Sequence, residues 1–394
     1  MNSAKKILKN QGLGTENPAK SKGAAVSNKN KILLAIGIIV ILVLSLGICY
    51  IQLRPREILE VTGLDKTGAA VTNKVYYKEA MYDIYMAETQ YNSYEQIYRQ
   101  IYGGRTYWEA ENVDDEGNDG ATVAKKQIMD SIKQREILYM EAMKADLSLT
   151  DAENKTVNEQ VESTMKNLSA SQKRIAGLDE KTIKSVVEKE ALAQKYKQQV
   201  ISGLGIDEAA LKKTVSKKDY RQYTLQYYTF AKTEKDKDGK DVSKDAAALK
   251  KAKTDMETLR KKAATAKDFT KDIIADKDKD NKDDSTGISY STKDLIETDK
   301  DFLDDATRKQ VKAMKNGAIS EVIETKDAYY VIKMVNNDDP KAYNNQCTQV
   351  VSDEKEKQFD TKYNSEIKGN YTTEVQSYWK GRVNVGYLTS GTSN

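Results

Sequence analysis

Residues 314–335 have the sequence MKNGAISEVIETKDAYYVIKMV, which predicts two β-strands joined by a tight turn. The stretches 319–325 and 328–335 are rich in β-branched and aromatic residues, as strands usually are. Asn316-Gly317 is a strong turn signal before the first stretch, and Asp327 lies at the turn into the second. This part of the chain therefore predicts an antiparallel sheet.

The sequence upstream supplies further elements of the same unit. Residues 223–230 (YTLQYYTF) predict another strand, and the segment about 302–314 predicts a helix that leads into the turn at Asn316. Phe269 with Ile273 and Ile274 predicts a short helix. Between these elements, apolar residues at helical spacing predict an amphipathic helix containing Leu249, Ala252, Met256, Leu259 and Ala263. We expect residues 219–338 to form a curled sheet wrapped by helices.

The regions on both sides of this unit predict mainly helices. Helices are expected at 125–145, 153–170, 180–202, 207–218 and 352–380, after two short β-prone pieces within residues 54–75. Thr150 and Glu153 have capping-box spacing, and Asp207 is a candidate N-cap. The expected fold class is α+β: a helical bundle of residues 54–218 and 339–394, interrupted by the inserted sheet domain.

Four tyrosines predict one face of a helix before Gly103-Gly104. Tyr91, Tyr94, Tyr98 and Tyr102 follow one another at offsets of three and four residues. Packing against a neighbouring helix and gripping of unfolded chains are the two interpretations of this face.

The N-terminal region predicts a membrane anchor. Residues 32–53 are 22 residues without a charge, enough for a helix to span the hydrocarbon core of a bilayer. Residues 1–31 carry seven lysines and one glutamate, which predicts a basic cytoplasmic tail by the positive-inside rule. We therefore expect a single-pass protein of the cell membrane whose residues after Arg54 lie outside the cytoplasm.

Two processed forms compete with a retained anchor. A cleaved signal peptide would have a shorter apolar core and small residues before the cleavage site. Lipidation is the other alternative, because residues 46–49 (LGIC) are similar to a bacterial lipoprotein box, although Ile48 is bulkier than that motif prefers.

Composition excludes several classes of function. Histidine is absent, so no Ser-His-Asp triad and no histidine-bearing zinc site can form. Two cysteines, Cys49 and Cys347, cannot supply a thiolate metal cluster. We expect no cofactor and no metal. The net charge of +4 and the mixed-sign lysine runs also argue against nucleic acid as a partner.

Several motifs resemble a known family. The resemblance to parvulin-type prolyl isomerase domains lies in Ala266–Phe269 (AKDF), in residues 314–320 (MKNGAIS) and in residues 328–333 (AYYVIK). Residues 128–153 resemble the long helix, turn and capped restart of the helical chaperone part of SurA and PrsA foldases. The similarity covers about residues 58–385.

The resemblance also implies a site. The two histidines of the parvulin family fall on Tyr227 and Tyr330, and the positions that line the prolyl pocket fall on Leu295, Phe302 and Met314. Isomerisation breaks amide resonance against a barrier near ~18–20 kcal/mol without a covalent intermediate. Tyrosines cannot supply the donor and acceptor pair of a neutral imidazole in the same geometry, so reduced or absent isomerase activity is expected.

The sequence thus predicts a membrane-anchored extracytoplasmic foldase or chaperone that acts on unfolded or newly translocated polypeptides. One alternative is an active prolyl isomerase that uses Tyr227, Tyr330, Leu295 and Phe302. Another is a structural or adaptor protein of the envelope, whose inactive parvulin-like fold binds one partner.

Overall fold

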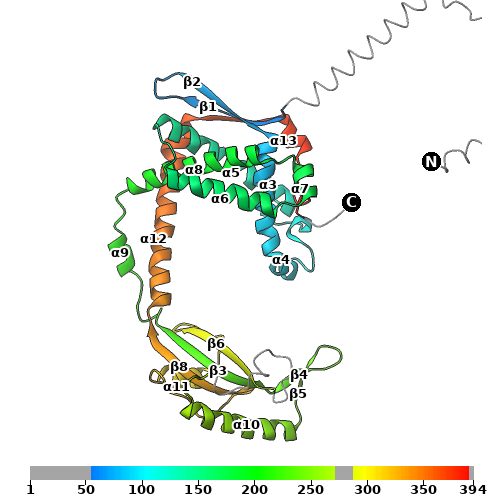
Figure 1. The fold of residues 1–394 in the computed structure, drawn as a ribbon, viewed down its shortest axis with the longest axis vertical. Helices are drawn as coiled ribbons and strands as arrows, with labels where there is room; N and C mark the ends of the chain where they lie inside the picture. Colours follow the sequence, from blue (N-terminus) through cyan, green and yellow to red (C-terminus); the bar gives the residue numbers. More distant parts are fainter. Residues whose placement is uncertain (1–54, 271–286, 390–394) are drawn as a thin grey trace, which may run out of the picture.

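The computed structural model describes residues 55–270 and 287–389. Helices combine with antiparallel sheets, so the α+β class is confirmed. The expected membrane helix at 32–53 lies outside the described residues; within them, no helix has the length and apolar character needed to cross a bilayer. The molecule is a crescent: a helical body and a sheet unit lie at its two ends, and helix α12 (Lys341–Lys362) runs between them (Figure 1).

A three-stranded sheet caps the helical body. Strands β1 (Glu57–Leu64), β2 (Ala70–Tyr76) and β9 (Thr372–Val375) pair antiparallel in the order β2-β1-β9. The helix predicted at 352–380 is wrong over its last part, because residues 372–375 form strand β9. The backbone of residues 372–375 pairs with residues 59–62 of β1, and its two threonines and valine favour an extended chain.

Helices form the rest of the body. A single helix bearing the four tyrosines was expected, but the chain breaks at Tyr94, between α3 (Tyr77–Ser93) and α4 (Glu95–Ile101). The side chain of Thr150 accepts from the Glu153 amide and Asp207 accepts from the Ala210 amide, so both expected caps are present. The helices are α3 (Tyr77–Ser93), α4 (Glu95–Ile101), α5 (Gly120–Lys144), α6 (Asp151–Asn167), α7 (Ala170–Ala176), α8 (Glu180–Ser202), α9 (Glu208–Lys213), α12 (Lys341–Lys362) and α13 (Ser377–Arg382).

Four of these helices depart from their predicted bounds, and the first is α5, which starts at Gly120 and not at 125. Helix α6 ends at Asn167, where Leu168 and Ser169 turn the chain into α7, and α9 ends at Lys213. Helix α12 starts at Lys341, directly after Pro340, because proline is tolerated next to the first helical turn. After Lys362 the helix continues as one π-helical segment, Tyr363–Ile367, and a 3₁₀ turn.

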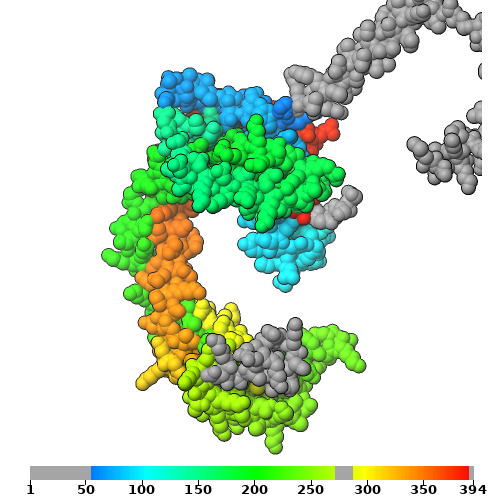
Figure 2. All heavy atoms as spheres, viewed as in Figure 1, coloured from blue at the N-terminus to red at the C-terminus, as the bar shows by residue number. Residues whose placement is uncertain are grey.

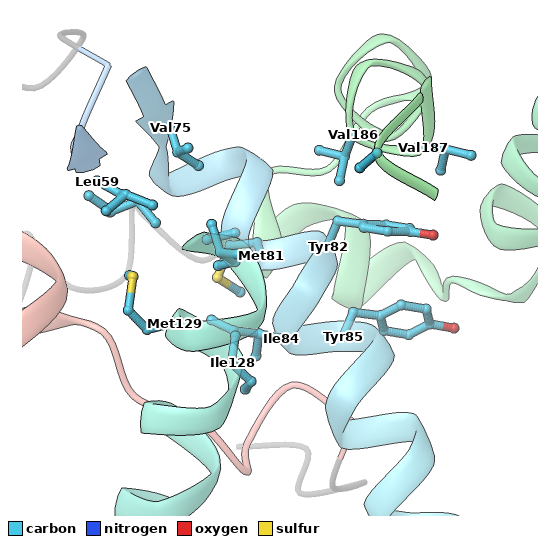
Figure 3. Packing of buried hydrophobic residues seen from close by; sticks show 14 of the residues in the cluster. Leu59, Val75, Met81, Tyr82, Ile84, Tyr85, Ile128, Met129, Val186 and Val187 are labelled. Carbon is cyan, nitrogen blue, oxygen red and sulfur yellow. The ribbon is translucent and has the colours of Figure 1, made fainter. Parts of the chain in front are cut away.

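One hydrophobic core joins the two ends of the chain in the helical body. Figure 3 shows its centre, where Met81 and Ile84 of α3 face Ile128 and Met129 of α5. Phe359 of α12 is fully buried in the same cluster. The residues that follow α12 contribute Tyr363, Ile367, Trp379, Val383 and Leu388.

A buried carboxylate fixes the end of the described chain. Glu88 of α3 is 0% exposed, and its Oε1 accepts from the Gly386 and Tyr387 amides at 2.7 and 3.2 Å. Its Oε2 accepts from the Thr389 amide at 2.7 Å and from the Thr389 hydroxyl at 3.0 Å. Gly386 has φ +89° and lies against Trp108, so a larger residue would be strained there. We call residues 386–389 and Glu88 the C-terminal clamp.

The sheet unit, residues 222–339, has four antiparallel strands in the order β6-β3-β8-β7. Strand β6 was not predicted, and β7 covers only two residues of the expected 319–325. The short helix expected at Ile273 lies outside the described residues. The elements are β3 (Gln222–Ala231), a β4 (Thr233–Lys235) and β5 (Asp241–Ser243) hairpin, α10 (Ala246–Thr265), β6 (Ser289–Ile296), α11 (Asp305–Lys312), β7 (Ile323–Glu324) and β8 (Ala328–Asp339).

Candidate functional site

Side chains of the central strands alternate between two covered faces of the sheet. On β3, Tyr228 and Phe230 pack with Met256 of α10. Tyr223, Leu225 and Tyr227 point to the other face, in one cluster with Val311 of α11. Because strands have a period of two, Tyr330, Ile332 and Met334 of β8 share that second face. We call it the α11 face.

The α11 face brings all five candidate site residues into one cluster. The rings of Tyr227 and Tyr330 lie 5.9 Å apart between centroids, and Phe302 lies 5.3 Å from Tyr227 and 6.0 Å from Tyr330. We call these three half-buried rings the aromatic triad. Edge-to-face and tilted contacts at such distances stabilise aromatic clusters and leave ring faces for an apolar ligand.

The other two candidates differ in accessibility. Met314 is half-buried beside the triad, whereas Leu295 is 0% exposed. A ligand can therefore reach Met314 and Phe302 directly, but Leu295 can only support the surface from beneath. Strand β6 holds Leu295 there, since Leu295 pairs with Tyr223 across the β3–β6 ladder.

A buried arginine holds Phe302 in place. The Arg308 side chain, 7% exposed, donates to the carbonyls of Lys300, Phe302 and Leu303 at 3.1, 3.2 and 2.8 Å. It also pairs with Asp305 in the first turn of α11. The guanidinium of arginine has five N–H donors in one plane, so several carbonyls of one loop can surround it. No spacing of residues indicates this role, because the three carbonyls converge only once the loop has folded.

The electrostatic character of the triad is neutral. Burial raises the pKa of Tyr330, so its phenol stays protonated at neutral pH. Tyr228 lies on the opposite face, where its hydroxyl donates to the Phe269 carbonyl at 2.8 Å and burial raises its pKa. The α11 face can thus offer aromatic surface and phenolic hydroxyls to a ligand, and the triad itself contributes no charge.

A second surface lies on the helical body. Helix α4 has no buried residue, and Tyr94, Ile97 and Ile101 are 50, 52 and 65% exposed. Two rings of the predicted tyrosine face pack on the segment that follows α4. Tyr91 stacks on Tyr107 at 4.3 Å between centroids, and Tyr98 lies 4.9 Å from Tyr107. The neighbour of that face is therefore an aromatic cluster that includes Trp108, while the isoleucines remain exposed.

The described residues contain no cluster of three or more Cys, Asp or Glu that could hold a metal ion. Cys347 is buried in α12 as a free thiol. The five candidate residues on the α11 face are two phenols and three apolar side chains, which suits non-covalent binding.

Comparisons with known proteins give only partial similarities. No family model matches the chain. No curated protein matches it either. Among solved structures, foldase protein PrsA from Streptococcus pneumoniae is 18% identical over 62% of this chain and 87% of its own, with a TM-score of 0.27. PrsA from Bacillus subtilis is 14% identical, with 65% and 88% covered and a TM-score of 0.21. The peptidylprolyl isomerase PrsA from Bacillus cereus is 15% identical, with 64% and 87% covered and a TM-score of 0.19.

Proposed function

We propose that this protein is a membrane-anchored extracytoplasmic folding factor that holds unfolded or newly translocated polypeptides. In this proposal residues 1–31 are a cytoplasmic tail, residues 32–53 are the anchor, and residues 54–218 with 339–394 form the chaperone body. Residues 219–338 form a parvulin-like domain whose isomerase activity is reduced or absent.

The observation that carries the proposal is the apolar surface of α4 beside the hollow of the crescent. In the space-filling view the α4 lobe lies on one side of the hollow and the sheet unit on the other (Figure 2). Ile97 and Ile101 of α4, and Tyr94 directly before it, are large side chains that are at least half exposed. Soluble proteins seldom expose such a group without a binding role, and unfolded polypeptides offer the apolar segments that would cover it.

The aromatic triad supports a prolyl-binding role for the sheet unit. Stacked against Phe302 and the two tyrosines, a proline ring would be removed from water, as would the amide before it. Desolvation favours the twisted amide, in which the C–N bond has lost double-bond character. The phenols of Tyr227 and Tyr330 can donate hydrogen bonds to a ligand, but they cannot act as an imidazole pair.

The test is suppression of aggregation by the full chain in nanodiscs of neutral lipid, with empty nanodiscs as the blank. A chemically denatured client is diluted into the sample and light scattering is followed. We expect scattering to fall in proportion to the amount of protein. Scattering unchanged at a tenfold molar excess, together with no binding of an unfolded chain, would refute the holding function.

An active isomerase is the second candidate, favoured by the convergence of the triad from β3, β8 and the segment before α11. Its test is cis-to-trans conversion of a proline tetrapeptide. If the protein is active, Phe302→Ala abolishes the acceleration, and Tyr290→Phe, on the α10 face of the sheet, leaves it unchanged. No acceleration by the unmodified protein leaves the holding role alone.

A further inference from the structure

The lobe formed by α4 and the segment before α5, residues 94–119, combines an apolar stripe with a strong negative charge. Tyr94, Ile97 and Ile101 follow one another at spacings of three and four residues, so they form one stripe along α4. The other side of the helix is occupied, because Tyr98 and Tyr102 contact Tyr107. The two isoleucines of the stripe therefore remain exposed, and Tyr94 at its start contacts the Tyr98 ring at 6.5 Å between centroids.

The segment that returns from α4 to α5 supplies the charge. Residues 105–119 contain six carboxylates and one basic residue, Arg105, for a net charge of −5. Arg105 is already paired with Glu111 at 3.2 Å. Asp115 and Glu116 are exposed. This segment runs beside α4 in the structure (Figure 1), with Tyr107 packed on the side of the helix opposite the stripe, so its negative potential surrounds the same small lobe that carries the stripe.

From this juxtaposition we propose that the 94–119 lobe binds apolar segments of unfolded polypeptides that are flanked by lysine or arginine. The inference rests on the proposed holding function and adds the chemistry of the client. The apolar residues of the client cover Ile97 and Ile101, while its cationic flanks lie in the field of the acidic segment. Clients flanked by aspartate or glutamate are repelled.

Charge argues for this occupant against two others. A second copy of the chain would bring one −5 segment against another, which disfavours association through this lobe. An anionic bilayer surface would be repelled in the same way. A basic apolar polypeptide is complementary to both features at once.

The test compares three labelled peptides with the same apolar core and with lysine, serine or glutamate flanks. Anisotropy is measured with the full chain in nanodiscs of neutral lipid. We expect the lysine-flanked peptide to bind about 5–10-fold more tightly than the glutamate-flanked one at low salt, since each exposed ion pair contributes a few-fold. The ratio shrinks at 0.5 M salt, because screening acts on the flanks and not on the core.

Two exposed double variants separate the contributions. Ile97→Ser with Ile101→Ser should weaken all three peptides together, and Asp115→Lys with Glu116→Lys should reverse or abolish their order. Leu64→Ser with Met143→Ser is the matched control, since both residues are similarly exposed on the body away from α4. This control should keep both the affinities and the order.

The outcomes distinguish this inference from the proposed function. Aggregation suppression without any dependence on flanking charge, or unchanged after the serine substitutions in α4, overturns the inference alone. Absence of both suppression and peptide binding refutes the proposed function itself. Dimerisation that disappears in the α4 serine variant, or binding to anionic vesicles through α4, would identify a different occupant and would also overturn the inference.

Discussion

Replacing Glu88 with glutamine should release the C-terminal clamp. An amide nitrogen cannot accept, so one of the two backbone bonds of 2.7 Å, from Gly386 or Thr389, is lost. Leaving that buried N–H without a partner costs about 1–3 kcal/mol, and bonds to a neutral oxygen are weaker than those to a carboxylate by about 1 kcal/mol. We therefore expect the clamp to lose about 3 kcal/mol, which is a factor of about 100 in its opening equilibrium.

Hydrogen exchange with mass spectrometry on the full chain measures this opening directly. Peptides that cover residues 384–389 should exchange about 100-fold faster in Glu88→Gln, as the free-energy difference requires. Glu95→Gln is the control, because the Glu95 carboxylate is 42% exposed and pairs only with Arg99 on the surface of α4. Unchanged protection of the Gly386 and Thr389 amides in Glu88→Gln would show that the carboxylate does not hold this segment.

Further predictions concern the core, the sheet and acid stability. Phe359→Ala should destabilise the helical body by about 3–5 kcal/mol in urea unfolding followed by circular dichroism, because the ring is fully buried; a loss below about 1 kcal/mol would contradict its place in the shared core. Tyr228→Phe should destabilise the sheet unit by about 1–2 kcal/mol, since the Phe269 carbonyl loses its 2.8 Å bond, and an unchanged midpoint would count against that bond. Hydrogen bonds from Lys232 and Lys253 lower the pKa of Glu324 to about 2. The ionised carboxylate therefore stabilises the fold above pH 4.5, and this stabilisation is lost as pH falls toward 2. Glu324→Gln should accordingly reduce the unfolding midpoint at pH 7 but not at pH 2, and an equal effect at both values would refute the pairing.

Local sequence signals predicted the elements whose stability is local. The capping box at Thr150 and the aromatic run of β3 need only their near neighbours, and both appear where the sequence indicates them. Strands β6 and β9, which were not predicted, depend on distant partners. Strand β6 has the polar sequence SYSTKDLI and is extended because it pairs along β3, and β9 pairs with β1 from more than 300 residues away.

The candidate site shows the same division. Tyr227 and Tyr330, which the family resemblance indicated, share a face because side chains alternate along each strand and because the β3–β8 register pairs Tyr227 with Ile332; alternation can be read from the sequence, but the register cannot. The burial of Leu295 depends on β6, and the placement of Phe302 depends on the three carbonyls that surround Arg308. The burial of Leu295 and the placement of Phe302 cannot be predicted from the spacing of residues along the sequence, since both arise from tertiary packing.

The chain enters and leaves the sheet unit at neighbouring points. Gln222, at the start of β3, is paired with Asp339, at the end of β8, and α12 begins two residues later. An ancestral gene could therefore have gained the unit by a single insertion, and could lose or exchange it by recombination, without rearranging the body around it. Related chains that keep the helical ends but join them by a short linker, or by another module, would be the evolutionary record of this geometry.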